Sequence, residues 1–289
     1  MYNKLVTRRD FVKAAAVTTA AFSTFNILGA QAVAGIHTSK IKVALIGCGG
    51  RGKGALKNFL EAAKLLGVEV EVVAVADAFQ DQIEGAITQF SLDPSVGHSG
   101  FTAYQAVAQS DAEVVLMATP PNFRPVHFDA CVQAGKHCFI EKPVAVDPVG
   151  ARKVIATGEL AAKKGLTVVA GTQRRHQQNY QEMAAKIQAG AIGEIVGGSV
   201  SWNMGTLWTY PRKPGMSHAD FLARNWLNFT EMSGDHIVEQ HVHQLDVVNW
   251  MMGRMPRTFV GMGGCARRGV AGGNQFDFFS LDMDYGEDR

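Results

Sequence analysis

Apolar residues are concentrated in short continuous runs through the first half of the sequence. These runs are rich in β-branched side chains, which is typical of strands buried on both faces of a sheet. They cover Ile41–Ile46, Val70–Asp77, Val114–Ala118, His137–Ile140 and Thr167–Ala170. Between them, helices are expected around the stripe Leu56, Phe59, Leu60 and Ala63, and over Gln80–Phe90, Tyr104–Gln109, His127–Ala134 and Pro148–Lys164. Repeated strand–helix units predict an α/β fold with a doubly wound parallel sheet.

The pattern changes after Gly171. Residues 171–190 predict a helix that ends at a glycine, and residues 195–205 (IVGGSVSWNMG) alternate like a strand with one solvated face. Further strand-like segments cover Thr258–Gly264 and Phe276–Tyr285. This pattern favours a second α+β domain, with a mostly antiparallel open sheet, over residues 172–289. A sheet ending there would leave an exposed edge, so we expect the domain to be incomplete and the chain to be a fragment of a longer protein.

The first apolar run leads into a glycine-rich turn, GCGGRG at residues 47–52, which a helical pattern follows. Glycines let the backbone turn sharply and approach a pyrophosphate, whose charge the helix N-terminus attracts. The predicted cofactor contacts from this turn are Gly47, Gly49, Gly50, Arg51 and Gly52. Asp77 ends the second run, where a carboxylate can bind both ribose hydroxyls and repel a 2′-phosphate. We therefore expect a dinucleotide-binding domain of the Rossmann type over residues 40–171, with NAD favoured over NADP. The alternative is an ordinary strand–turn–helix with a capping aspartate.

The N-terminal 34 residues resemble an export signal. Arg8 and Arg9 precede a weakly apolar, alanine-rich stretch that ends in small residues, as in twin-arginine signals. An ordinary amphipathic helix is the alternative. The chain has 28 basic and 26 acidic residues, and the signal holds four of the basic and one of the acidic ones, so the remainder is 24 against 25. That balance indicates no nucleic acid partner, and no stable membrane insertion is expected after cleavage. We expect an exported, periplasmic protein that uses the twin-arginine machinery.

Four segments together resemble the Gfo/Idh/MocA family of oxidoreductases, named after glucose–fructose oxidoreductase and inositol dehydrogenase. They are GCGGRG, TPPNFRPVH, GKHCFIEKPVAVD and VHQLDVVNW. The resemblance covers the chain from about residue 40 onward, and the twin-arginine start looks like the exported branch of the family. It implies hydride transfer between NAD(P) and a hydroxyl of a sugar, cyclitol or related polyol, and a homo-oligomer. It also implies cofactor contacts at Thr119, Pro120, Pro121, Asn122, His127, Glu141 and Lys142.

The expected chemistry needs a base for the hydroxyl proton and a positive group near the oxygen. The resemblance assigns the second task to Lys142, which follows a strand of the cofactor domain; a surface lysine is the alternative. The resemblance also matches Glu239 and His243 to an acidic residue four positions before a histidine. His243 is then the general base, because imidazole titrates near neutral pH, and Glu239 either orients it or binds substrate hydroxyls. We expect Asp246 to lie behind His243.

The segment that carries these residues, GDHIVEQHVHQLD, allows other interpretations. On one continuous helix, His236, Glu239, His243 and Asp246 would share a face. The first three could bind a metal, but they spread over two helical turns, so no metal is expected. A solvated polar face is the remaining alternative.

Substrate contacts are expected from Arg174, Arg175 and Asn203, in addition to Glu239 and His243. Surface cations are the alternative for the two arginines. The aromatic residues Trp202, Trp208, Tyr210 and Trp226 either stack on sugar rings or pack in the core.

Three functions are consistent with these residues. The first is a dehydrogenase, and the second a glycoside hydrolase that oxidises its substrate transiently with NAD. The third is a sugar-binding protein without catalysis, which the presence of Lys142 and His243 argues against.

Overall fold

The structure, a computed structural model, describes residues 40–266 and 273–286; the expected export signal lies outside them. The elements of the first half are β1 (Ile41–Ile46), α2 (Gly50–Leu65), β2 (Val70–Asp77), α3 (Gln80–Phe90), η1 (Pro94–Val96), β3 (Gly97–Ser99), α4 (Tyr104–Gln109), β4 (Val114–Met117), α5 (Arg124–Gln133), β5 (His137–Ile140), α6 (Pro148–Lys163) and β6 (Val168–Ala170). Those of the second half are η2 (Gln173–His176), α7 (Gln178–Gln188), α8 (His218–Arg224), η3 (Trp226–Asn228), α9 (Thr230–Ser233), α10 (Asp235–Glu239), α11 (Val242–Met252), β7 (Thr258–Gly264) and β8 (Phe278–Asp284).

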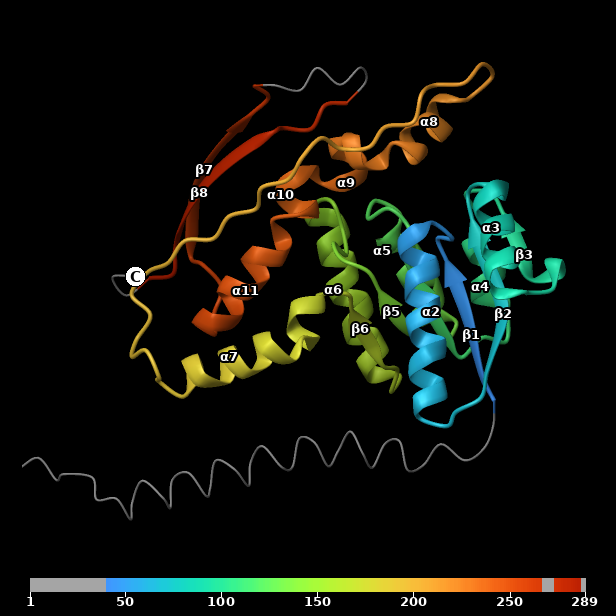
Figure 1. Cartoon of the computed structure of the whole chain (residues 1–289), viewed down its shortest axis with the longest axis horizontal. Coiled ribbons are helices and arrows are strands. Elements are labelled where there is room, and N and C mark those ends of the chain that lie inside the picture. The colour runs from blue at the N-terminus through green and yellow to red at the C-terminus, as the bar shows by residue number, and fades with distance from the viewer. Residues whose placement is uncertain (1–39, 267–272, 287–289) are drawn as a thin grey trace, which may run out of the picture.

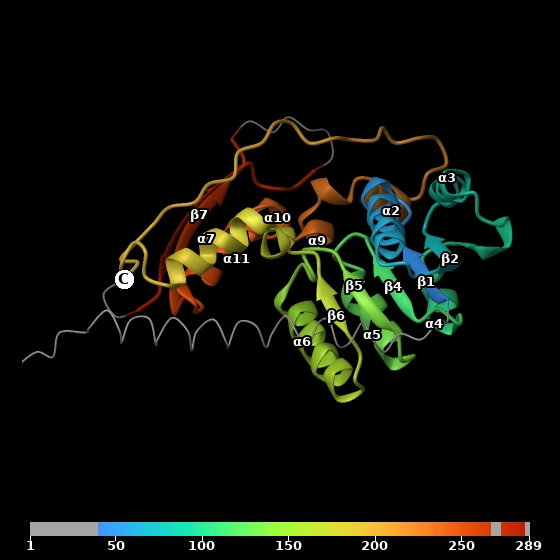
Figure 2. The ribbon, with the colours of Figure 1, turned by 60° about the horizontal axis from the view of Figure 1, so that its bottom comes forward.

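The first six strands form one parallel sheet in the order β3-β2-β1-β4-β5-β6. The order reverses between β1 and β4, so a crevice forms at the carboxyl ends of these two strands, which is where doubly wound sheets bind ligands. Figures 1 and 2 show α2 and α3 on one face of this sheet and α4, α5 and α6 on the other. The predicted fold class is confirmed.

Alternate residues of the central strands pack on opposite faces of the sheet. In β1, Val43 and Leu45 pack with α2 and α3, whereas Ala44 and Ile46 pack with α4, α5 and α6. All four are at most 2% exposed. Burial on both faces explains why these strands read as continuous apolar runs in the sequence.

The described residues of the second half form helices and one antiparallel pair, β7 with β8. The prediction of a strand within residues 195–205 is wrong, because this segment pairs with no strand in the described part of the chain. Its alternating apolar residues Val196 and Val200 are exposed instead of forming a buried face. Alternation predicts a strand only where a neighbouring strand can accept its hydrogen bonds.

Two predicted helices differ from the observed ones at their starts. The helix predicted at His127–Ala134 begins earlier, at Arg124, because Pro125 is tolerated in the first helical turn, where its missing N–H costs nothing. The single helix predicted over residues 171–190 is a 3₁₀ turn, η2, followed by α7.

Candidate active site

The turn between β1 and α2 admits only glycine at two positions. Gly47 has a backbone φ of 93°, and a Cβ there would lie 2.7 Å from main-chain atoms of Ala118 and Thr119. A Cβ at Gly52 would lie 1.7 Å from the carbonyl oxygen of Gly47. The ends of β1 and β4 and the first turn of α2 therefore approach one another through backbone atoms, as a G-x-G-x-x-G turn requires.

The other two glycines face open space. Gly49 is the N-cap of α2, so no side chain caps this helix. A Cβ at Gly49 or Gly50 would meet no atom within 4 Å. Main-chain N–H groups in the first turn of this helix have no intrahelical partner and lie at the positive end of its dipole. Open backbone and positive charge together fit the pyrophosphate of a dinucleotide.

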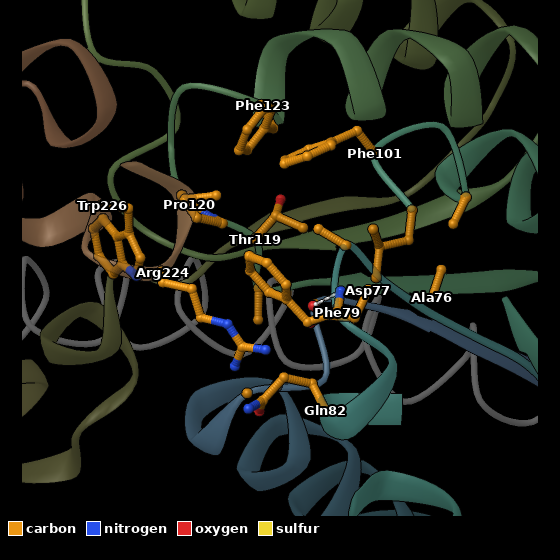
Figure 3. A pocket seen from close by; sticks show the side chains of 18 of the residues that line it. Ala76, Asp77, Phe79, Gln82, Phe101, Thr119, Pro120, Phe123, Arg224 and Trp226 are labelled. Atoms are coloured by element: carbon orange, nitrogen blue, oxygen red, sulfur yellow. Dashed lines mark hydrogen bonds between the residues drawn. The ribbon is translucent and has the colours of Figure 1, made fainter. Parts of the chain in front are cut away.

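A cavity of about 450 Å³ opens beside this turn, at the carboxyl edge of the parallel sheet (Figure 3). The predicted cofactor residues in its wall are Gly47, Gly49, Gly50, Arg51, Gly52, Asp77, Thr119, Pro120 and His127. The second half of the chain adds Trp208, Tyr210, Ala223, Arg224 and Trp226. The predicted contacts Pro121, Asn122, Glu141 and Lys142 lie outside this wall. A nucleotide in the cavity would touch both halves of the chain.

Asp77 ends β2 with both carboxylate oxygens bound to main-chain N–H groups. Oδ2 accepts from Cys48 at 2.7 Å and Oδ1 accepts from Phe79 at 3.0 Å. Burial raises the pKa of the Asp77 carboxyl, while the two N–H groups and the positive charge of Arg224 oppose the rise. Each oxygen retains acceptor capacity, so the carboxylate can still bind ribose hydroxyls.

Arg51 connects the cavity to the predicted catalytic lysine. Its guanidinium lies 2.5 Å from Oε1 of Glu141, a buried carboxylate that follows β5. The other oxygen of Glu141 accepts from the main-chain N–H of Lys142 at 3.1 Å. Because β5 pairs with β4, Lys142 follows the strand next to the one that carries Thr119 and Pro120 into the cavity wall.

Lys142 and Glu239 form a nearly buried ion pair between the two halves of the chain. The lysine Nζ donates to Oε1 of Glu239 at 2.8 Å and to its main-chain oxygen at 2.7 Å. The two side chains are 15% and 6% exposed. Burial raises the pKa of the Glu239 carboxyl, and the ammonium of Lys142 opposes this shift. The ammonium is thus held in a fixed position between the two halves of the chain, after the strand that pairs with β4.

The continuous helix predicted through His236, Glu239, His243 and Asp246 is wrong. The chain forms α10 and α11 instead, with a break at Gln240. The main-chain oxygen of Glu239 binds Lys142, while the N–H of His243 donates to Gln240 at 3.2 Å. The lysine therefore takes the carbonyl that would accept from His243 in an unbroken helix.

His243 lies against Trp202, with ring centroids 5.5 Å apart and an angle of 27° between the planes. Burial and the charges of Lys142 and Arg174 lower the pKa of His243 to about 4. Its imidazole is therefore neutral near pH 7, as a general base requires. Oε2 of Glu239 has no hydrogen-bond partner among the described residues, so in this structure the carboxylate does not hold His243 in place.

The two predicted substrate arginines have different surroundings. Arg174 stacks near Trp202, with its Cζ 5.5 Å from the ring centroid, and binds Gln244, close enough to His243 to affect its pKa. Arg175 instead donates to both carboxylate oxygens of Asp246 at 2.9 Å. Asp246, expected behind His243, is thus a partner of Arg175. This ion pair holds η2 against α11.

Asn203 lies apart from the nucleotide cavity. It is exposed and lines a second cavity, between residues 195–203, α11 and the β7–β8 pair. Arg224 was not foreseen as part of the nucleotide cavity, because nothing local in its sequence marks it.

Within the described ranges, no three His, Cys, Asp or Glu side chains converge to hold a metal ion. No helix of that part has the length and apolar character needed to cross a membrane.

A parallel sheet with this strand order, a glycine turn and a cavity at its carboxyl edge is a dinucleotide-binding Rossmann fold. Residues 41–172 match the model of the Gfo/Idh/MocA oxidoreductase family, NAD-binding Rossmann fold. Residues 41–172 are therefore similar to the NAD-binding domain of Gfo/Idh/MocA-family oxidoreductases.

Curated relatives are similar over more than this domain. The chain is 28% identical over 215 residues to inositol 2-dehydrogenase of Burkholderia ambifaria, covering 74% of this chain and 55% of the relative. It is 26% identical over 186 residues to 2,7-anhydro-N-acetylneuraminate hydratase of Mediterraneibacter gnavus, covering 63% and 45%. The chain thus spans about half the length of these relatives.

Solved structures share the fold. The WlbA dehydrogenase of Bordetella pertussis, solved with NADH and UDP-GlcNAcA, superposes with a TM-score of 0.63 at 20% identity, covering 86% of this chain and 68% of that one. A putative myo-inositol dehydrogenase of Sinorhizobium meliloti gives 0.59 at 21% identity, covering 84% and 65%.

Proposed function

We propose that this protein transfers a hydride between NAD and a secondary hydroxyl of a sugar, cyclitol or related polyol. The single observation that carries the proposal is the Lys142–Glu239 pair, joined by contacts of 2.7 and 2.8 Å after β5, the strand next to the one that leads into the cavity wall. The similarity to inositol 2-dehydrogenases supports the substrate class.

Three side chains would handle the alcohol. The ammonium of Lys142 would donate to the substrate oxygen and stabilise negative charge as the hydroxyl loses its proton. His243, neutral because burial lowers its pKa to about 4, would accept that proton. Oε2 of Glu239, which has no partner in the described part of the chain, would accept from a neighbouring hydroxyl and orient the ring. Bound NAD would supply the hydride acceptor.

Substitution of Lys142 tests this function. We expect Lys142→Ala to lose at least about a hundredfold in kcat, because a positioned proton-handling group contributes about that much or more. Lys153→Ala removes an exposed lysine that pairs with Asp129 on the surface, and serves as the matched control. Reduction of NAD by a panel of polyols, followed at the NADH absorbance band, is the measurement. A folded Lys142→Ala variant with full turnover would rule the mechanism out.

A second candidate is a glycoside hydrolase that oxidises its substrate only transiently. The similarity to a hydratase acting on an anhydro sugar favours it, because a hydratase adds water. Oxidation at one ring carbon acidifies the neighbouring C–H, so the bond to the leaving group can eliminate. Water then adds and the hydride returns. Aryl glycoside cleavage without net NADH would support this candidate, whereas accumulation of NADH supports the dehydrogenase.

We further propose that residues 1–34 direct export through the twin-arginine pathway to the periplasm, and that the exported protein is a homo-oligomer. The Arg8–Arg9 pair and the alanine-rich stretch after it support the first proposal. Replacing both arginines with lysine should leave unprocessed protein in the cytoplasm. Light scattering of the purified protein tests the second, and a monomer at all concentrations would exclude it.

We also propose that residues 40–171 and 172–289 are separate domains, which limited proteolysis tests.

A further inference from the structure

Arg224, the last residue of α8, is fastened over the edge of the Rossmann sheet. Its Nη1 donates to Oδ2 of Asp81 at 2.8 Å and its Nη2 to Oδ1 at 2.5 Å. Its Cζ lies 3.8 Å from the ring centroid of Phe79, within cation–π distance. These contacts reach from the second half of the chain to the start of α3, 143 residues earlier. They fix the guanidinium in a defined place.

That place is the end of the cavity where Asp77 lies. Arg224, Phe79 and Asp77 all line the cavity, and Figure 3 shows the guanidinium close to the ring of Phe79, on the side of Gln82. Phe79 donates its N–H to Asp77, so the three residues are adjacent. The carboxylate that follows the second strand of a Rossmann fold binds the adenosine ribose, so this is the ribose end of the site.

The guanidinium of Arg224 has N–H donors that the bonds to Asp81 do not use. An arginine side chain carries five N–H donors, and the bonds to Asp81 use one on each of two nitrogens. Three N–H groups are left, one of them on Nε. The carboxylate of Asp77 is held by the N–H groups of Cys48 and Phe79, so it is fixed in place and does not pair with Arg224.

We propose that Arg224 is a specificity residue for the 2′ substituent of the adenosine ribose, and that it lets the protein bind NADP as well as NAD. Asp77 accepts hydrogen bonds from the free 2′-hydroxyl of NAD. Arg224 presents a planar set of donors at the same end of the cavity, and this arrangement suits a phosphate group. Its positive charge, which Asp81 shares, reduces the repulsion between Asp77 and the 2′-phosphate. This inference rests on the nucleotide site proposed above and extends its cofactor range.

A purely structural role makes a different prediction. If Arg224 only fastened α8 to α3, its loss would open the cavity and weaken NADH and NADPH equally. Lysine keeps the charge but cannot form the two-pronged bond to Asp81. Arg224→Lys therefore separates the two roles, because it keeps an attraction for phosphate and loses the fastening.

The test is direct binding of NADH and NADPH to the purified chain, followed by nucleotide fluorescence. We expect the unchanged protein to bind NADPH within about tenfold of NADH. Arg224→Gln should weaken NADPH about tenfold or more, as expected for lost hydrogen bonds to a charged group, and NADH less than about threefold. Arg224→Lys should restore most of the NADPH affinity. Arg212→Gln is the matched control, because Arg212 stacks on Phe221 in the same segment and does not line the cavity.

Equal weakening of both nucleotides by Arg224→Gln would overturn the proposal, as would NADPH binding more than about a hundredfold weaker than NADH in the unchanged protein. Circular dichroism of each variant confirms that it is folded. Failure of the proposed function has a different signature: both nucleotides would bind, with the expected discrimination, while no polyol was oxidised.

Discussion

The ammonium of Lys142 donates to Glu239 twice, at 2.8 Å to the carboxylate and at 2.7 Å to the main-chain oxygen. The second bond survives any change of the Glu239 side chain, so the lysine stays in place when the carboxylate is altered. The contribution of the carboxylate to substrate binding can therefore be measured separately from the position of Lys142.

Glu239→Gln should raise KM for polyol substrates about tenfold, because a neutral amide replaces the charged carboxylate that would accept a hydrogen bond from a substrate hydroxyl. The main-chain bond to Lys142 is kept, so kcat should fall less than KM rises. Steady-state kinetics on a polyol panel gives both values. Glu182→Gln, on the exposed face of α7, is the control. An unchanged KM would mean that Glu239 does not touch the substrate.

His243→Asn should lower kcat/KM by about a hundredfold or more, the usual contribution of a positioned base. Burial and neighbouring positive charge lower the pKa of His243 to about 4, so the imidazole is unprotonated down to mildly acidic pH. The unchanged protein should therefore keep its activity from neutral pH to about pH 5, and lose it below. A pH–rate profile whose acid limb lies near the ordinary histidine pKa of 6.5 would contradict this assignment.

Protonation of buried histidines should destabilise the fold in acid. Burial lowers the pKa of His127 and of His243 to about 4, from an ordinary value of 6.5. Between these values the unfolded chain binds more protons than the folded one, so stability is fully present above about pH 6.5 and is lost as the pH falls toward 4. Melting temperature against pH should show this loss. His127→Gln should flatten the curve, whereas His218→Gln at an exposed position should leave it unchanged.

Two glycine substitutions should separate folding from nucleotide binding. Gly52→Ala places a Cβ 1.7 Å from the oxygen of Gly47, so it should destabilise the protein by about 3 kcal/mol, as overpacking does. Gly49→Ala meets no protein atom, so melting should hardly change. Its methyl group would stand in the cavity beside the first turn of α2, so NADH affinity should fall. Equal melting temperatures for the two variants would refute this division.

Arg175→Ala should lower stability by about 1 kcal/mol and leave NADH affinity unchanged. The side chain pairs with Asp246 at 2.9 Å and stacks on Trp250 with its Cζ 4.9 Å from the ring centroid, so it joins η2 to α11. Partly exposed pairs contribute about this much. Chemical denaturation and nucleotide titration give the two values. A rise in substrate KM without loss of stability would instead support the substrate role expected from the sequence.

The Rossmann sheet could be predicted from the sequence because most of its signals are local. Ile41–Ile46 and Val70–Asp77 are apolar runs buried on both faces, and Gly52 is needed by a backbone contact within its own turn, whereas Gly47 is needed by the approach of Ala118 and Thr119. The match of the predicted runs to β1, β2, β4 and β5 follows from this. The prediction of a strand within residues 195–205 was wrong for the opposite reason. A strand needs a neighbouring strand to pair with, and the alternation of residues in one segment does not show whether such a neighbour exists.

The candidate site was predictable only in part. Motifs alone assign roles to Lys142 and His243, and these roles stay predictions, whereas the contact between Lys142 and Glu239 joins residues 97 positions apart. No periodicity could show that the lysine would bind a main-chain oxygen next to a break at Gln240. Arg224 was missed entirely, since a single arginine on a short helix has no distinguishing pattern before the chain folds.

The contact of Lys142 with a main-chain oxygen beside the break between α10 and α11 makes the position of this ammonium depend on completed folding. A lysine in the first half can reach its two acceptors only after the second half has docked, so a partly folded chain holds this amine unengaged and free to move. Alcohol chemistry can therefore appear only after the two halves have docked, and the nucleotide cavity, which both halves line, is completed in the same step.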